Sequence, residues 1–214
     1  MTGTSTYNLP DIQLLNKETS QFLIWIPDKS YLVLGASNRA EESLFIDNVT
    51  RDDITVLKRP SGGQAVLLTP NNLIIAAVFV DPTAFQPKDI FHNLNSMILS
   101  AMEKSGIKEL SLMGISDIAI AGKKILGSSI YRNQNRMLYH AVLNVSEPSA
   151  TFEKYLKHPV KEPDYRHGRN HTNFVTSLKE KGYTQSQSQL SKALTKTFEI
   201  AFSCSSDNSK ASEE

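Results

Sequence analysis

The stretch Arg59-Pro60-Ser61-Gly62-Gly63-Gln64-Ala65-Val66 is the most informative part of this sequence. It predicts a turn with two adjacent glycines between two apolar, strand-like runs, with an arginine at its start. Because glycine has no Cβ, Gly62 and Gly63 let the backbone approach a ligand closely. The amides of such a turn can face an anion, either a carboxylate or a phosphate. The stretch therefore predicts ligand binding, although a simple hairpin turn would fit it when taken alone.

A second stretch, residues 117–129 (DIAIAGKKILGSS), adds an amine and another turn of small residues. We expect Lys124 to act in a site, although most lysines lie on protein surfaces. Lys123 would point to the opposite face of a strand, and we expect it to be solvated. Together the two stretches predict a site that holds an activated acyl group.

The composition excludes several classes of protein. With 214 residues, 40% of them apolar, the chain can form a sizeable core. A formal net charge of +1 is too balanced for binding nucleic acid by charge alone. No apolar run approaches the ~20 residues of a membrane span, and the first residues do not resemble a signal peptide. The single cysteine fits a reducing compartment, so we expect a cytoplasmic enzyme or binding protein.

Turn residues and apolar periodicity divide the chain into short elements. The predicted strands are residues 21–26, 30–35, 54–58, 65–69, 73–80, 109–113, 117–121, 124–130 and 137–145. The predicted helices are residues 38–47, 87–105, 149–157, 173–179 and 189–201. This order predicts an α+β fold: a single domain, residues 1–202, with a central mixed, mostly antiparallel sheet flanked by helices. Residues 203–214 are polar and are expected to form a disordered tail.

Several motifs, in a fixed order, resemble those of one enzyme family. Residues 58–66 resemble the Arg-Arg-x-Ser-Gly-Gly-Gly-Ala-Val signature of lipoate–protein ligases and related octanoyltransferases. Residues 116–118 resemble the family's Asn-Asp-[Ile/Leu] element, and residues 122–129 its Lys-[Ile/Val]-x-Gly-Ser-Ala element. Residues 138–143 stand where the family has Leu-His-His-Gly-Thr-Leu. The resemblance covers residues 21–145 and implies a fold like that of biotin ligases and class II synthetases.

The resemblance implies that lipoate or octanoate is attached to a carrier lysine. The carrier would be the lipoyl domain of a 2-oxoacid dehydrogenase or a glycine cleavage H-type protein. In the ATP-using branch the acid attacks the α-phosphate, pyrophosphate leaves, and the lysine then attacks the mixed anhydride. The implied substrates are the acid and ATP with Mg. No tightly bound metal is expected, because the five histidines lack ligand spacing with carboxylates or thiols, apart from His167 and His171, four residues apart in a non-helical loop.

The motif positions imply roles for particular residues. Both transition states gather negative charge on oxygen, which a fixed cation and backbone donors stabilise, and Lys124 is the implied catalytic cation. Val66, Ile75 or Ile125 would wall a slot for the apolar acid. The implied substrate or nucleotide contacts are Arg59, Ser61, Gly62, Gly63, Gln64, Ala65, Asp117, Gly127, Ser128 and His140.

The residues by themselves leave two of these roles open. Asp117 fits a turn cap as well as a group that orients Lys124 or contacts the nucleotide. His140 fits a hydrogen-bonded core histidine as well as a site residue. Residues 158–171 form a charged, proline-rich loop that is either a surface crossing or a lid or carrier contact.

Two rival functions follow from departures from the family pattern. An ATP-independent octanoyl or lipoyl transferase would need a cysteine nucleophile in an ordered pocket. Cys204 lies outside the matched region in a serine-rich tail, which favours a ligase. Gln64 replaces the third glycine, Leu68 a frequent histidine, and Ala141-Val142 a Gly-Thr pair. These changes favour a non-catalytic lipoyl-binding or scaffold module.

The length of the chain bears on the adenylation step. Many complete lipoate ligases carry an extra C-terminal domain that supports adenylation, and 214 residues leave no room for a full one. The alternatives are a separate accessory chain, a compact variant, or an enzyme that performs the transfer alone.

Overall fold

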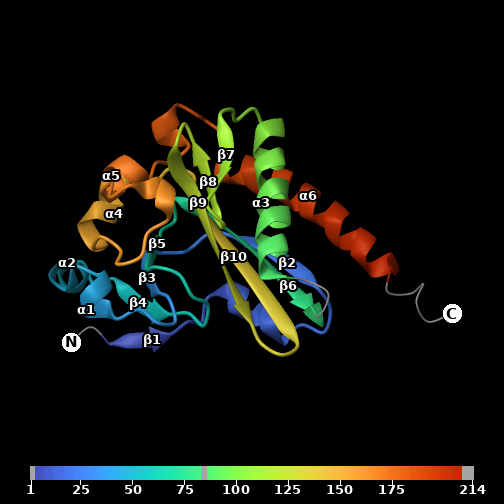
Figure 1. The fold of residues 1–214 in the computed structure, drawn as a ribbon, viewed down its shortest axis with the longest axis horizontal. Coiled ribbons are helices and arrows are strands. Elements are labelled where there is room, and N and C mark those ends of the chain that lie inside the picture. The colour runs from blue at the N-terminus through green and yellow to red at the C-terminus, as the bar shows by residue number, and fades with distance from the viewer. Residues whose placement is uncertain (1–2, 83–85, 209–214) are drawn as a thin grey trace.

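A computed structural model of the chain describes residues 3–82 and 86–208, without the side chains of residues 204–208. Its strands form two sheets with helices on both sides (Figure 1). The strands are β1 (Thr4–Thr6), β2 (Gln21–Trp25), β3 (Tyr31–Leu34), β4 (Thr55–Lys58), β5 (Val66–Leu68), β6 (Asn72–Val80), β7 (Leu110–Met113), β8 (Asp117–Ile120), β9 (Lys123–Arg132) and β10 (Arg136–Asn144).

The described residues form six α-helices, of which α3 and α6 are long, and three short 3-10 helices. The α-helices are α1 (Ala40–Ser43), α2 (Ile46–Arg51), α3 (Pro87–Lys104), α4 (Ser149–Tyr155), α5 (His171–Phe174) and α6 (Gln187–Asn208). The 3-10 helices are η1 (Pro10–Asn16), η3 (Asp164–Arg166) and η4 (Lys179–Lys181). Among the described residues, no helix has the length and apolar character needed to cross a membrane.

The larger sheet has six strands in the order β2-β6-β10-β9-β8-β7, and every neighbouring pair is antiparallel. The smaller sheet has the order β1-β4-β3-β5, and it contains the parallel pairs β1/β4 and β3/β4. The predicted α+β fold with a mostly antiparallel sheet flanked by helices is therefore confirmed. The parallel and antiparallel pairings that the sequence suggested for one mixed sheet are divided between two sheets.

Helices α3 and α6 cover one face of the larger sheet. Figure 1 shows them together, on the side away from the smaller sheet and from α1, α2, α4 and α5. Pro87 begins α3, where its missing N–H costs no hydrogen bond. The chain leaves the helix through Gly106, whose φ of +87° favours glycine. Ile98, Met102 and Phe198 are buried in the core between the helices and the sheet.

Three segments differ from the sequence-based expectation. The expected helix over residues 38–47 is interrupted, because Leu44 forms a β-bridge with Leu156. The expected helix over residues 173–179 is limited to α5, because the Thr176 amide donates to the Lys124 carbonyl and joins the chain to β9 instead. The segment before residue 21, for which the sequence analysis predicted no helix or strand, contains β1 and η1.

The C-terminal segment also differs in part. Helix α6 continues through residues 203–208, where we expected the disordered tail to begin. Residues 209–214 of that predicted tail lie outside the described residues.

The packing of α6 predicts a large cost for truncating its buried face. Leu194 is 1% exposed in the core, whereas Ile200 on the same helix is 60% exposed. We expect Leu194→Ala to lower the free energy of unfolding by about 2–5 kcal/mol, because it removes buried methyl groups and leaves a cavity. Ile200→Ala should change it by less than about 0.5 kcal/mol. Urea denaturation of both variants checks this, and equal effects would contradict the packing.

Candidate functional site

A cavity of about 760 Å³ lies between the larger and the smaller sheet. This volume is typical of small-molecule sites. Side chains alternate along β10, so that His140 and Val142 line the cavity while Tyr139 and Ala141 face the core under α3 and α6. The apolar part of the lining comes from both sheets: Val33, Val66, Leu68, Ile74, Ile125 and Val142.

The prediction of Val66, Ile75 or Ile125 as the wall of an acyl slot is partly confirmed. Val66 and Ile125 line the cavity. Ile75 faces the opposite side of β6 and is buried against the helices, because its neighbour Ile74 takes the cavity face. The sequence alone could not decide this, since β6 is apolar on both faces.

Lys124 and Asp117 form an ion pair on the cavity wall. Lys124 Nζ lies 2.9 Å from Asp117 Oδ1, and the carboxylate is nearly buried while the amine side chain keeps 29% of its exposure. A β-bulge between β8 and β9 shifts the register at this point, which is one way that strands re-aim a side chain. The other carboxylate oxygen, Asp117 Oδ2, accepts a hydrogen bond of 2.7 Å from the Tyr165 hydroxyl. The carboxylate therefore holds the ammonium, and it is itself held by the loop.

Gly127 makes room for this ammonium. A Cβ at Gly127 would lie 2.6 Å from both Lys124 Cε and Nζ, closer than van der Waals contact allows. Gly127 pairs with Asp117 on β8 and with Val142 on β10, so the lysine head lies over the sheet surface at this glycine. The absence of a side chain here is a condition of the observed lysine geometry.

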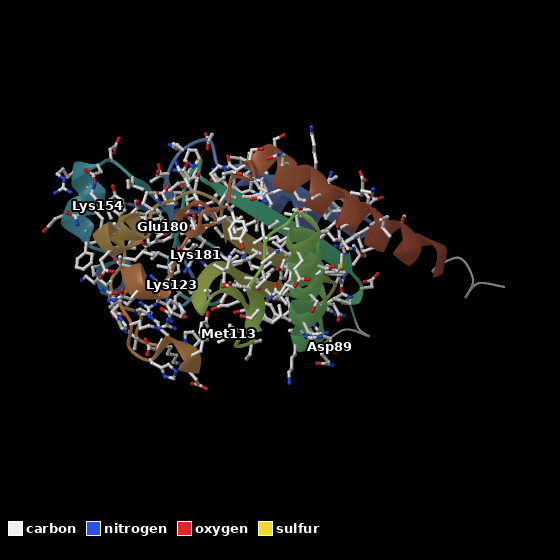
Figure 2. All side chains as sticks on the ribbon, turned by 90° about the horizontal axis from the view of Figure 1, so that it is seen from above. Asp89, Met113, Lys123, Lys154, Glu180 and Lys181 are labelled. Atoms are coloured by element: carbon white, nitrogen blue, oxygen red, sulfur yellow. The ribbon has the colours of Figure 1, made fainter. Side chains whose placement is uncertain are left out.

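Lys123, next to Lys124 on β9, does not line the cavity and contacts the protein instead. Its Nζ donates to the carbonyl of Thr172 at 3.1 Å. Figure 2 shows Lys123 beside the segment that carries α4 and α5. Lys123 is thus a partly buried structural contact and not the solvated residue that we expected.

The turn between β4 and β5 is organised by Arg59. The guanidinium is buried and donates through Nε to Ser61 Oγ at 3.0 Å and through Nη1 to the Val33 carbonyl at 3.2 Å. Its Nη2 donates to the carbonyls of Gly62 and Gln64 at 2.8 and 2.9 Å. Burial lowers the pKa of Arg59 to about 10. Arg59 lines the cavity, but all three of its nitrogen atoms bond to the protein, so its first role is to hold the turn.

The backbone of Gly63 packs closely against the protein itself, at the end of β3, and the predicted approach to a ligand stays a prediction. Gly63 has a φ of +89°, in the left-handed region that favours glycine. Its carbonyl oxygen lies so near Gly35, at the end of β3, that a Cβ at Gly35 would overlap it. The turn therefore lies against β3, with Gln64 and Ala65 on the cavity lining.

A buried chain of hydrogen bonds runs from the turn to the N-terminal segment. Ser61 Oγ lies 2.6 Å from His140 Nε2, and His140 Nδ1 lies 3.0 Å from Asp11 Oδ2. The Tyr7 hydroxyl donates to Asp11 Oδ1 at 2.7 Å, and burial, followed by the Asp11 charge, raises the pKa of Tyr7. Ser61 Oγ also lies 3.1 Å from Ser129 Oγ. His140 is therefore both a hydrogen-bonded interior histidine and part of the cavity lining.

Asp11 is the functional candidate that the sequence analysis missed. It belongs to η1, in a segment for which the sequence analysis predicted no helix or strand. The Pro10-Asp11 pair is a local signal for the start of a helix. Its contact with a histidine 129 positions away depends on tertiary structure, and no spacing in the sequence indicates it.

The loop over residues 158–171 borders one end of the cavity. Its lining residues are His158, Pro159, Val160, Lys161, Glu162, Pro163, Arg166 and His171. Arg166 is buried, its Nε donates to the Arg169 carbonyl at 2.8 Å, and its guanidinium lies 4.7 Å from the centre of the Phe174 ring. Its Nη2 has no hydrogen-bond partner among the described residues. Its Nε also lies 3.4 Å from Glu162 Oε2, so the charge is partly paired while Nη2 keeps a hydrogen-bond donor for an anion.

Most of the predicted site residues come together around this cavity. Those on its lining are Arg59, Gly63, Gln64, Ala65, Asp117, Lys124, Gly127, Ser128 and His140. Ser61 is buried against His140 and Ser129, and Gly62 is exposed on the turn. The Ser128 hydroxyl donates to the Ser116 carbonyl at 2.7 Å, so this group is engaged in the protein. Within the described ranges, no group of three or more His, Cys, Asp or Glu side chains could hold a metal ion.

Comparison with known proteins gives one family. The model of the lipoyl protein ligase A/B catalytic domain matches residues 12–199. Lipoate-protein ligase A of Psychrobacter cryohalolentis is 29% identical over 150 residues, which are 69% of this chain and 42% of the relative. Lipoate-protein ligase LplJ of Bacillus subtilis is 27% identical over 126 residues, 58% of this chain and 36% of the relative. The chain thus spans less than half the length of these curated relatives.

Solved structures of the same type share the fold. A bipartite lipoate protein ligase from Thermoplasma acidophilum, studied with its E2 lipoyl domain, has a TM-score of 0.72 at 20% identity over 84% of this chain and 69% of that chain. A lipoate-protein ligase A bound with ATP has a TM-score of 0.72 at 18% identity over 92% of this chain and 84% of that chain.

The buried state of His171 predicts a pH dependence of stability. Burial, and next the positive charge of Arg166, lower the pKa of His171 from 6.5 to about 4. Between these values the unfolded chain binds a proton that the folded chain rejects. The free energy of unfolding should therefore be independent of His171 protonation above pH 6.5. Between pH 6.5 and about pH 4 it should fall as the pH falls, by up to about 3 kcal/mol.

An NMR titration of the His171 ring, assigned with the His171→Gln variant, checks this shift. We expect a midpoint near 4 and a smaller loss of stability in the variant over the same pH range. A midpoint near the ordinary value of 6.5 would contradict the burial of this ring.

Proposed function

Because the chain belongs to the lipoyl protein ligase A/B catalytic-domain family, we propose that it attaches lipoate or octanoate to a carrier-domain lysine through an acyl-adenylate. The observation that carries this proposal is the Lys124 ammonium. It lies on a cavity lined by apolar side chains, held by Asp117 over Gly127. A fixed cation in a partly dry site is suited to stabilise negative charge that develops on oxygen.

The cavity offers separate places for the apolar tail and the carboxylate of the acid. The apolar tail would lie between the sheets against Val66, Ile74 and Val142. Its carboxylate would then reach Lys124, which neutralises the charge and orients one oxygen toward the α-phosphorus of ATP. When that oxygen attacks, pyrophosphate leaves, and Lys124 stays beside both the carbonyl and the phosphate of the mixed anhydride. Gly63 and Gln64 would border this group from the turn.

The loop end of the cavity supports ATP, with Mg, as the co-substrate. Lys157, Lys161 and Arg166 line this end, and Nη2 of the buried Arg166 has no hydrogen-bond partner in the described part of the chain. Such cations suit a triphosphate, which carries several negative charges. A lipoate-protein ligase A of the same fold has been solved bound with ATP, which is consistent with this reading.

The rival transferase mechanism needs a nucleophilic thiol. Residue 204 is the single cysteine, and its backbone belongs to the last turns of α6. Figure 1 shows this end of α6 on the far side of the molecule from α4 and α5. This position favours adenylation over a thioester route. The single cysteine also fits a reducing compartment, and we propose the cytoplasm.

The proposed partner is a lipoyl-carrier domain of a 2-oxoacid dehydrogenase or a glycine cleavage H-type protein. A solved relative has been studied with its E2 lipoyl domain. A separate accessory chain is part of the proposal, because a ligase that shares this fold is bipartite. The remaining alternative, a module that binds lipoate without turnover, is favoured by Gln64 and Leu68, which depart from the family motif.

The test compares two neighbouring lysines. We expect Lys124→Met to lower ATP-dependent transfer of lipoate to a carrier domain by about 10²–10³-fold, because it removes the cation from the reacting oxygens. Lys123→Met, one residue earlier and bound to the Thr172 carbonyl, is the matched control and should retain transfer. A mass shift on the carrier, measured with and without ATP, gives the readout.

Each outcome of this assay has a consequence. Transfer without ATP from an acyl carrier protein would favour the transferase. Lipoate binding without any product would favour the non-catalytic module. Equal activity in the Lys124→Met and the unaltered protein would contradict the proposed role of the ammonium.

A second variant tests the position of the ammonium and keeps its charge. In Gly127→Ala the new Cβ must displace Lys124 Nζ, which is the end of a flexible side chain, so the fold should tolerate it. We expect a loss of transfer within about tenfold of that of Lys124→Met, since misplaced catalytic groups cost up to about 10²-fold. Gly3→Ala, where a Cβ meets nothing within 4 Å, is the control. Full activity in Gly127→Ala would show that this geometry is unimportant.

A further inference from the structure

When the His140 ring is neutral, the hydrogen bonds around it run in one direction. Asp11, as a carboxylate, can only accept, so His140 Nδ1 carries the hydrogen that points to it. His140 Nε2 of the neutral ring then accepts from the Ser61 hydroxyl at 2.6 Å. Ser61 Oγ in turn accepts from Arg59 Nε, which can only donate. The remaining lone pair of Ser61 faces Ser129 Oγ at 3.1 Å.

This arrangement points the hydroxyl hydrogens of Ser129 and Ser61 toward the imidazole. Ser129 donates to Ser61, Ser61 donates to His140, and His140 is oriented by Asp11. The same logic of nucleophile or donor, base and orienting carboxylate recurs in hydrolytic triads on unrelated folds. Ser61 is 1% exposed and so is not itself presented to a ligand. Ser129 and His140 both line the cavity, and Ser129 stands at the donor end of the chain.

Ser129 lies close to the reacting end of the cavity. It is two residues along β9 from Gly127, on the same face, which is a separation of about 7 Å between Cα atoms. The Lys124 ammonium lies over Gly127. Asp117, the nearest carboxylate, has its two oxygens bonded to Lys124 and Tyr165. It is therefore poorly placed to accept a further proton.

The proposed reaction requires a proton acceptor at this end. The carrier lysine attacks the acyl carbon of the mixed anhydride, a C–N bond forms, and the C–O bond to phosphate breaks with release of AMP. The attacking nitrogen becomes positively charged and must lose one proton to give the neutral amide. A group that takes this proton in the transition state accelerates the step by about 10²–10⁴-fold.

We propose that Ser129, Ser61, His140 and Asp11 form a relay that accepts the proton of the attacking carrier lysine. The proton passes from the amine to Ser129, the Ser129 hydrogen to Ser61, and the Ser61 hydrogen to His140 Nε2. The imidazolium that forms is stabilised by Asp11. Ser129 is the catalytic residue, and Asp11 and Ser61 are positioning residues. This inference rests on the proposed function and extends it to the second half-reaction.

The experiment distinguishes an effect on proton transfer in the second half-reaction from an effect on formation of the acyl-adenylate. Hydroxylamine is an uncharged, strong nucleophile at neutral pH and traps acyl-adenylates as hydroxamates without an enzymatic base. Each variant is therefore assayed twice with lipoate and ATP, once with a carrier domain and once with hydroxylamine. A variant that only disturbs the cavity lowers both products, whereas loss of the relay lowers transfer to the carrier alone.

Asp11→Asn and Ser129→Ala interrupt the relay at its two ends. In Asp11→Asn the amide can donate to His140 Nδ1, which reverses the direction of the chain and keeps its hydrogen bonds. We expect both variants to lower transfer to the carrier by about 10²-fold or more and hydroxamate formation by less than about twofold. Ser129→Thr, which keeps a hydroxyl, should restore transfer.

Matched controls are Asp89→Asn and Ser188→Ala, at exposed positions on α3 and α6. Figure 2 shows Asp89 at one end of α3, across the molecule from Lys154 on α4. Both controls should leave both products unchanged. Equal loss of both products in Asp11→Asn and Ser129→Ala, or no loss of either, would overturn the relay. Failure of the unaltered protein to form any hydroxamate would overturn the proposed function, and the relay with it.

Discussion

The ion pair between Lys124 and Asp117 is the interaction on which the site depends. A lysine at the mouth of an apolar cavity would extend into water unless a carboxylate held it, because its ammonium is strongly hydrated. Asp117 supplies that carboxylate at 2.9 Å, and Tyr165 fixes the carboxylate from the loop side. Gly127 leaves the space that the amine occupies. Three elements that are separate in sequence therefore determine the position of one charge.

The two sheets explain why this charge faces a cavity and not a packed core. The larger sheet gives one face to α3 and α6 and the other to the smaller sheet. Arg59 holds the turn of the smaller sheet against β3 with four hydrogen bonds, so bonds within the protein fix this wall of the cavity. Preorganised groups of this kind cost no rearrangement when charge develops.

Much of this could be predicted from the sequence because it depends on local patterns. The apolar period of α3, the strand lengths and the Gly62-Gly63 turn all follow from neighbouring residues. The contact of Asp11 with His140 and the cavity face of Ile74 could not be predicted, because they depend on tertiary packing. Arg59 was expected to support an anion, and its hydrogen bonds show that it first satisfies buried carbonyls.

The most direct measurement of the central claim is a crystal structure with a non-reactive acyl-adenylate analogue, such as a lipoyl sulfamoyl adenosine. The account predicts that the acyl tail lies between the two sheets and that Lys124 Nζ lies about 3 Å from the acyl carbonyl oxygen. A complex in which the analogue binds elsewhere, or in which Lys124 turns away from it into solvent, would contradict the account.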